Sequence, residues 1–140
     1  MGAPGHSGVL EAAVYVSDLD ATERFYSGIL GLERIARVEG RHVFFRCGPS
    51  VILAFIAEAT RQPPADDAKL PVPPHGATGA GHVCIGSTGE LLEEWEKHLK
   101  DNDVEIEADF CWPNGARSIY LRDPAGNSVE IADQTLWRRT

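Results

Sequence analysis

Three polar residues stand within apolar stretches of the chain where strands are expected. Glu11 lies in VLEAAVYV, His82 in GHVCIGS and Glu130 in NSVEIA. A carboxylate in a strand that can be buried is costly unless it is paired, hydrogen-bonded or bound to a cation. Carboxylate oxygens and imidazole nitrogens are common ligands of divalent metals. One shared metal ion would therefore account for all three residues.

The period of a strand places these three residues on comparable faces. Side chains at i and i+2 share one face of a strand. In segment 9–16 this puts Glu11 opposite the more apolar face, and in 81–87 it does the same for His82. Glu130 also lies opposite the apolar residues of its strand. A lone Glu in a strand is usually solvent-facing and a lone His is usually hydrogen-bonded to protein, so the metal-site hypothesis depends on the coincidence of all three.

The elements that must position these residues begin with strand 9–16. A helix follows, with Asp20 and Glu23 as its expected capping pair, and it ends before Gly31. Three strands are predicted next, at 32–38, 41–47 and 51–56, separated by turn-forming residues. The predicted order of the first half is βαβββ.

The second half repeats this order. Strand 81–87 leads into a capping box from Ser87 to Glu90 and then into a helix with an apolar stripe. Further strands are predicted near Val104, Ile119 and Val129. We predict one domain over 1–140, made of module 7–58, module 79–135 and a linker at 59–78. The linker is rich in proline, and this composition suits neither a helix nor a central strand.

Composition narrows the classes of protein. A chain of 140 residues with 43% hydrophobic and 24% charged residues is typical of one globular domain. Its net charge of -8 argues against nucleic acid and anionic membranes as partners. No signal peptide or membrane span is expected from the apolar patterning. Three cysteines without a C-x-x-C pair favour a reducing cytoplasm over a disulfide framework or a thiolate zinc site.

Two longer motifs carry a resemblance to a known family. The pattern V-x-D-L-x-x-x-x-x-F-Y-x-x-x-L-G-L covers Val16 to Leu32, and D-P-x-G-N-x-x-E covers Asp123 to Glu130. With G-H-V between them at 81–83, they resemble the vicinal oxygen chelate superfamily, which includes glyoxalase I, the fosfomycin and bleomycin resistance proteins and the extradiol dioxygenases. The resemblance covers nearly the whole chain. It implies an α+β fold of two βαβββ modules that form a curled, cup-like mixed sheet with the helices outside.

The resemblance also implies four positions for metal ligands, on the first and last strands of each module. They fall on Glu11, Leu53, His82 and Glu130. The first is usually His or Gln, and the second is a carboxylate in glyoxalase I. Leu53 can neither ligate a metal nor take a proton, so a glyoxalase I reaction would lack one base. The other three would hold Mn, Fe, Ni, Co or Mg, and Zn also fits this set, with positions left open for substrate or water.

A partial likeness to the fosfomycin resistance enzymes concerns residues near the C-terminus. The segment from Arg117 to Tyr120 and the terminal Arg138 and Arg139 resemble parts that those enzymes aim at an anionic substrate. We expect Ser118, Tyr120 and Arg139 to bind substrate, and Glu130 and Tyr120 to be catalytic, with Tyr120 donating to a metal-bound oxyanion. Tyr120 could equally be a packing residue, and the terminal arginines a solvated tail.

The leading hypothesis is an enzyme whose divalent metal holds vicinal oxygens of a small substrate and stabilises an oxyanion. Lyase, isomerase and epoxide-addition chemistry all fit it. One alternative is a metal-free small-molecule-binding protein similar to the bleomycin resistance proteins. Another is an extradiol dioxygenase. We expect a homodimer, with modules paired within one chain or exchanged between chains.

Overall fold

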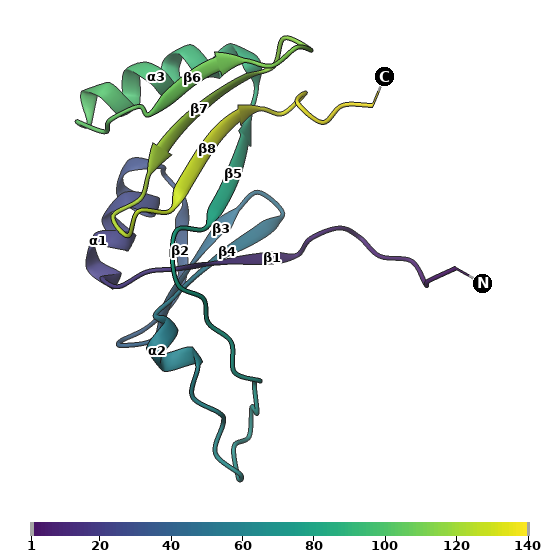
Figure 1. Cartoon of the computed structure of the whole chain (residues 1–140), viewed down its shortest axis with the longest axis vertical. Helices are drawn as coiled ribbons and strands as arrows, with labels where there is room; N and C mark the ends of the chain where they lie inside the picture. Colours follow the sequence, from purple (N-terminus) through teal and green to yellow (C-terminus); the bar gives the residue numbers. More distant parts are fainter. Residues whose placement is uncertain (1, 140) are drawn as a thin grey trace.

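Two βαβββ modules make up the computed structural model, which describes residues 2–139 (Figure 1). The first contains β1 (Glu11–Tyr15), α1 (Leu19–Glu23), the π-helical η1 (Arg24–Ile29), β2 (Glu33–Val38), β3 (His42–Cys47) and β4 (Ser50–Phe55). The second contains β5 (His82–Ser87), the 3₁₀ turn η2 (Gly89–Leu91), α3 (Leu92–Asp101), β6 (Ala108–Cys111), β7 (Arg117–Arg122) and β8 (Ser128–Asp133). A short helix, α2 (Ala57–Thr60), starts the segment that joins them.

Each module forms one four-stranded sheet. The strand orders are β1-β4-β3-β2 and β5-β8-β7-β6. The first strand of each module runs parallel to the last one, and the other neighbours are antiparallel. Neither sheet closes on itself. The predicted α+β class, with two βαβββ modules of mixed sheet and the helices outside, is confirmed.

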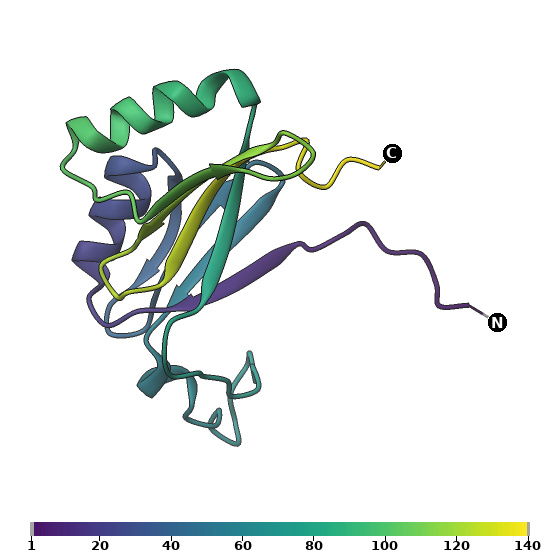
Figure 2. The ribbon, with the colours of Figure 1, turned by 45° about the horizontal axis from the view of Figure 1, so that its top comes forward.

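The inner faces of both sheets and the helices share one hydrophobic core. Its fully buried members include Tyr26, Phe45, Leu92, Leu99, Ile119 and Ile131. Figure 2 shows α1 and α3 on the same side of the two sheets. The η1 segment that continues α1 meets α3, and a bond of 2.7 Å joins His98 Nε2 of α3 to the backbone oxygen of Ile29. The opposite face of each sheet is left uncovered by helices.

The turn after β7 ties the two modules together. Asn127 Nδ2 donates to the backbone oxygen of Tyr15 at 2.9 Å, and Asn127 Oδ1 accepts from the backbone N–H of Gly81 at 2.8 Å. The side chain therefore contacts the ends of both first strands at once. Asn127 is 2% exposed, so these bonds satisfy a buried amide that would otherwise be costly.

Both predicted helix caps are wrong. The N-cap of α1 is Asp18, whose Oδ1 accepts from the backbone N–H of Ala21 at 3.0 Å. No capping box forms at Ser87: η2 begins at Gly89 with Thr88 as its N-cap, and the Ser87 hydroxyl accepts a 3.3 Å bond from Trp95 Nε1. The prediction for the end of the first helical segment is confirmed: Gly31 follows it with φ 75°, a conformation that glycine adopts without steric cost.

The strand predicted near Val104 is also absent. Asp103 has φ 57°, and the chain reverses there with a bond from the N–H of Val104 to the oxygen of Leu99. The side chain of Val104 packs against the core instead. The third strand of the second module is therefore β6, further along the chain, whereas the strands predicted around Ile119 and Val129 are confirmed as β7 and β8. No helix in residues 2–139 is long and apolar enough to cross a membrane.

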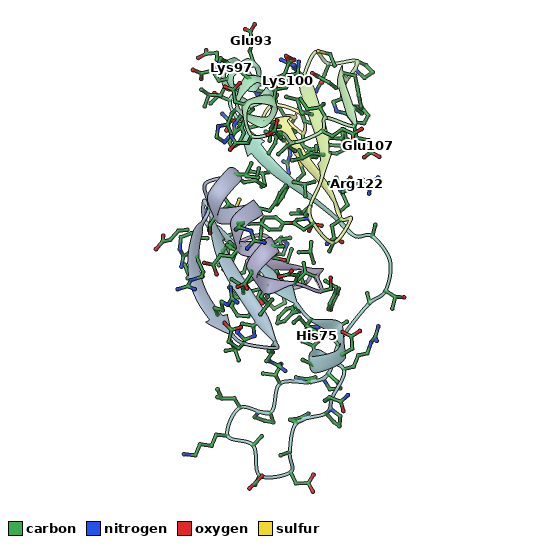
Figure 3. The ribbon with its side chains drawn as sticks, turned by 90° about the vertical axis from the view of Figure 1, so that its left-hand side faces the viewer. His75, Glu93, Lys97, Lys100, Glu107 and Arg122 are labelled. Atoms are coloured by element: carbon green, nitrogen blue, oxygen red, sulfur yellow. The ribbon has the colours of Figure 1, made fainter. Side chains whose placement is uncertain are left out.

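The Pro-rich segment after α2 leaves the body of the molecule and returns to β5. Figure 3 shows His75 close to α2, where this segment comes back. The hydroxyl of Tyr15 lies 2.7 Å from His75 Nδ1, and the N–H of His75 donates to the oxygen of Thr60 at 3.0 Å. These contacts hold the returning end of the segment, at His75, against the uncovered face of the first sheet.

Candidate functional site

The uncovered face of the second sheet gathers most of the expected site residues. The register places Cys84, Glu130 and Tyr120 side by side on β5, β8 and β7. Ser118 lies two residues from Tyr120 on this face, and His82 two residues from Cys84. The face assignments made from strand periodicity for the second sheet are therefore confirmed.

His82 and Glu130 form a close pair. His82 Nε2 lies 3.3 Å from Glu130 Oε1. His82 Nδ1 lies 3.1 Å from the backbone oxygen of Ser128, an atom that can only accept a hydrogen bond. A proton on Nδ1 therefore fits this geometry, and it leaves the Nε2 lone pair directed at the side of the ring where Glu130 lies. The side chain of His82 is 48% exposed, whereas that of Glu130 is 6% exposed.

Glu130 is held in place from its other oxygen. The Ser118 hydroxyl donates to Glu130 Oε2 at 2.5 Å, and Trp112 Nε1 donates to the same hydroxyl at 2.8 Å. A short bond to an ionised carboxylate is among the stronger hydrogen bonds in proteins. The relay from Trp112 through Ser118 fixes the orientation of the carboxylate. Sequence reasoning assigned no such role to Trp112, because the residue lies outside any periodic segment.

Tyr120 and Cys84 flank the buried carboxylate. Burial and then the charge of Glu130 raise the pKa of Tyr120 above its ordinary value. The same two causes raise the pKa of Cys84 to about 12, although part of the residue remains exposed. Both groups therefore keep their protons at neutral pH in the metal-free protein. The ring of Tyr120 lies between those of His82 and Phe110, with centroid distances of 6.1 and 5.7 Å.

The pair of His82 and Glu130 fits two positions of one metal ion. Nitrogen and oxygen ligands at roughly 2.0–2.2 Å from an ion lie about 3 Å apart when they occupy neighbouring positions. The 3.3 Å separation is close to this value. The hydrogen bonds on the outer atoms of both side chains match the outer contacts that orient metal ligands in proteins. The donor set therefore suits a divalent cation.

Glu11 does not join this pair within one chain. Among residues 2–139, no three His, Cys, Asp or Glu side chains approach closely enough to hold a metal ion together. Glu11 lies exposed on the uncovered face of the first sheet, opposite Val51. Leu53 lies on the same face, where its cross-strand neighbours are Ala13 and Phe44. The four implied positions are thus divided between two sheets.

The arginines expected to bind substrate lie apart from the pair of His82 and Glu130. Arg117 donates to Asp109 at 2.8 and 2.6 Å and to Glu96 at 2.7 Å, so its charge is already paired. Arg139 is exposed in the C-terminal tail and makes no recorded side-chain bond within residues 2–139. Neither contacts the pair of His82 and Glu130.

A matching family model and several solved structures relate the chain to known proteins. The model described as the Glyoxalase/Bleomycin resistance protein/Dioxygenase superfamily matches residues 8–131. A crystal structure of lactoylglutathione lyase from Agrobacterium tumefaciens is 38% identical with a TM-score of 0.90, and the match covers 97% of this chain and 100% of that one. No curated protein matches.

Two further structures share the fold at lower identity. A putative glyoxalase family protein from Bacillus anthracis is 17% identical with a TM-score of 0.70, over 94% of this chain and 98% of that one. A glyoxalase/dioxygenase from Nostoc punctiforme is 23% identical with a TM-score of 0.66, over 95% of each chain. Likeness at this level of identity shows a shared fold and does not show a shared reaction.

Proposed function

Because the chain belongs to the glyoxalase/bleomycin resistance protein/dioxygenase superfamily, we propose that it is a divalent-metal-dependent enzyme that acts on vicinal oxygens of a small substrate. The observation that carries the proposal is the geometry of His82 and Glu130. Their facing atoms are spaced for one ion, and Ser128 and Ser118 hold their outer atoms.

The reaction is of the lyase, isomerase or addition type. The lactoylglutathione lyase at 38% identity supports lyase chemistry. Leu53 stands where glyoxalase I has a carboxylate, so the base expected at that position is missing, and Glu130 is the carboxylate that we propose to move a proton at the substrate. We therefore favour a reaction with a single proton transfer over the two-base formation of lactoylglutathione.

Glu11 of a second copy is the proposed third ligand. Glu11 is exposed, and the uncovered face that carries it is not paired with the His82 face of its own chain. A homodimer that places the first sheet of one copy against the second sheet of the other would bring three ligands together. It would also cover the apolar residues now exposed on both faces, such as Leu10 and Phe110.

The metal would supply Lewis-acid stabilisation of a developing oxyanion. Around it, His82 presents Nε2 because Ser128 fixes the Nδ1 proton. Ser118 orients the carboxylate of Glu130, which holds or accepts the transferred proton. Tyr120 stays protonated and donates its hydroxyl hydrogen to a substrate oxygen.

Elemental analysis of protein purified without an affinity tag tests the metal. We expect close to one divalent ion per chain in the wild type, and little in His82→Ala and Glu130→Gln. Glu90→Gln, an exposed carboxylate on η2, is the matched control and should retain the metal. Wild-type protein that stays empty and gains no thermal stability from Mn, Fe, Co, Ni or Zn would overturn the proposal in favour of a metal-free binding protein.

Mixing two defective variants tests the shared site. Glu11→Ala and Glu130→Ala should each lose the metal. After unfolding and refolding together at equal amounts, mixed dimers carry one site with all ligands, so about a quarter of the sites should regain metal. No recovery of metal, with dimers present by sedimentation, would contradict a site shared between two copies.

Oxygen uptake with a catechol by the Fe(II)-loaded protein would instead identify a dioxygenase.

A further inference from the structure

A large cavity lies on the uncovered face of the first sheet, beneath the Pro-rich segment. Its volume is about 850 Å³, within the range that binds small organic ligands. Strands β1, β3 and β4 form its floor, and the segment between Ala59 and His75 forms its roof. Neither the metal-ligand residues of the second sheet nor their hydrogen-bond partners belong to it.

The floor of this cavity is apolar and aromatic. Leu53 and Phe44 are cross-strand neighbours in its middle, and Phe55 and His42 are neighbours in the next row. Phe44 lies edge-to-face with Phe55 at 5.4 Å and stacks on His42 at 4.0 Å. Such a surface favours a planar ring, because aromatic groups pair well at these distances.

One end of the cavity carries two polar groups that lack partners. His42 Nδ1 is a buried side-chain atom without a hydrogen bond within residues 2–139. The neighbouring Arg41 guanidinium lines the cavity and makes no recorded ion pair in the same part of the chain. Burial, and then the charge of Arg41, lower the pKa of His42, so the imidazole is neutral. An unpaired buried polar atom is costly unless a ligand or water satisfies it.

The roof exposes apolar side chains that a ligand would cover. Leu70 is 83% exposed and Val72 54%, and both line the cavity. His75 fixes this roof through its contact with Tyr15 and its edge-to-face packing on Phe55 at 4.6 Å. The contacts of His75 with Tyr15 and Phe55 therefore fix one edge of the cavity.

The other end of the cavity reaches Glu11. Glu11 and Tyr15 are four residues apart on β1, and Phe55 and His42 continue the row of Tyr15 across the sheet. At about 3.3 Å per residue, the two ends of the cavity are roughly 13 Å apart along the strand direction, and they also lie two strands apart across the sheet. A bound molecule would span from the proposed metal ligand, over Leu53, to Arg41.

We propose that this cavity is the specificity pocket of the enzyme and takes a substrate with an aromatic body and an anionic head group. The head group binds Arg41 and His42, the ring lies on Leu53 and Phe44, and the vicinal oxygens point towards Glu11. This inference builds on the proposed function. It also gives Leu53 a role. A carboxylate at this position would have to lose its hydration beneath the ring, whereas the leucine side chain packs against the ring.

Binding of 3-phenylpropionate tests the pocket without turnover. Titration calorimetry and the ring ¹⁵N signals of His42 report the binding. Propionate lacks the ring and 3-phenylpropan-1-ol lacks the charge, so both should bind more weakly by about tenfold or more. Equal binding of the alcohol would overturn the anionic head group, and equal binding of propionate would overturn the aromatic floor.

Variants locate the probe. Arg41→Gln should weaken binding at least about tenfold, and His42→Phe, which keeps the stacked ring, should weaken it several-fold. Arg24→Gln, an exposed arginine outside the cavity, is the control and should bind as the wild type does. Unchanged affinity in both pocket variants would refute the pocket.

His82→Ala separates this inference from the proposed function. The variant should lose the metal and still bind the probe with the wild-type affinity, because it leaves the cavity intact. Loss of binding in His82→Ala would mean that the carboxylate binds the metal rather than Arg41, and would overturn the pocket. Binding by a wild type that never takes up metal would contradict the metal proposal alone.

Discussion

The hydroxyl of Tyr26 donates a 2.8 Å hydrogen bond to Asp123 Oδ2, across 97 positions of sequence. Tyr26 belongs to the motif around the first helix and Asp123 to the D-P-x-G-N turn, so this bond joins the two motifs directly. Tyr26 is 0% exposed and Asp123 4%. Asp123 Oδ1 also accepts from the backbone N–H groups of Ala125 and Asn127 at 2.9 Å. The motifs that identify the family thus hold its two modules together.

Tyr26→Phe should destabilise the fold while keeping the ring packed. The variant removes one donor from a buried carboxylate, which costs about 1.5–3 kcal/mol. Urea unfolding at pH 7 measures the change, and an unaltered slope with denaturant would show that the folded state keeps its compactness. A loss below about 0.5 kcal/mol would mean that the bond contributes little to stability.

The same pair should make stability fall in alkali. Burial, and then the charge of Asp123, raise the pKa of Tyr26 far above the ordinary value of a tyrosine. The unfolded chain loses this proton near pH 10 while the folded chain keeps it, so this contribution is complete below about pH 10 and is lost as pH rises. The stability difference between wild type and Tyr26→Phe should narrow from pH 9 to pH 11. A constant difference would contradict the assignment.

Ser118→Ala should weaken metal binding without removing a ligand. The change frees Oε2 of Glu130 from its 2.5 Å bond and leaves Trp112 Nε1 without an acceptor. Loss of an outer contact of this kind typically lowers metal affinity by about 10- to 100-fold. Metal titration with a competing chelator measures it. Ser17→Ala, at an exposed position, is the control and should keep the wild-type affinity.

Asp109→Asn should lower stability only above acidic pH. Its hydrogen bonds with Arg117 hold the pKa of Asp109 below its ordinary value. That contribution is present above about pH 4 and is lost as pH falls through the lowered folded-state pKa. The pair is partly exposed, so we expect a loss under about 1 kcal/mol at pH 7. Unfolding at pH 3 and pH 7 should show the loss at pH 7 alone, and exposed Asp66→Asn should show it at neither.

Tyr15→Phe should loosen the roof of the cavity. The variant deletes the 2.7 Å contact with His75 and leaves the ring in place. Trypsin should then cut after Lys69 faster than in the wild type, because the segment opens more often. Trypsin should cut Tyr120→Phe, a variant on the other sheet, at the wild-type rate. Equal rates in all three proteins would mean that other contacts hold the roof.

Strand periodicity predicted which side chains share a face, because it is a local property of the backbone. His82, Ser118, Tyr120 and Glu130 therefore lie together as expected. The cap at Asp18, the position of β6 and the ion pairs of Arg117 were not predicted. The cap and the ion pairs depend on competition between nearby polar groups, which local patterns do not rank. The position of β6 depends on the reversal at Asp103, after which Val104 packs against the core.

The sequence by itself determined the two-module fold, the turn residues and the faces of the strands, since these follow from short-range geometry and from motifs that meet in space. Only the tertiary structure decided that Glu11 lies apart from His82 and Glu130, and that Leu53 forms the floor of a cavity. The distance between residues of different sheets depends on how their cores pack. No periodicity within one strand encodes that packing.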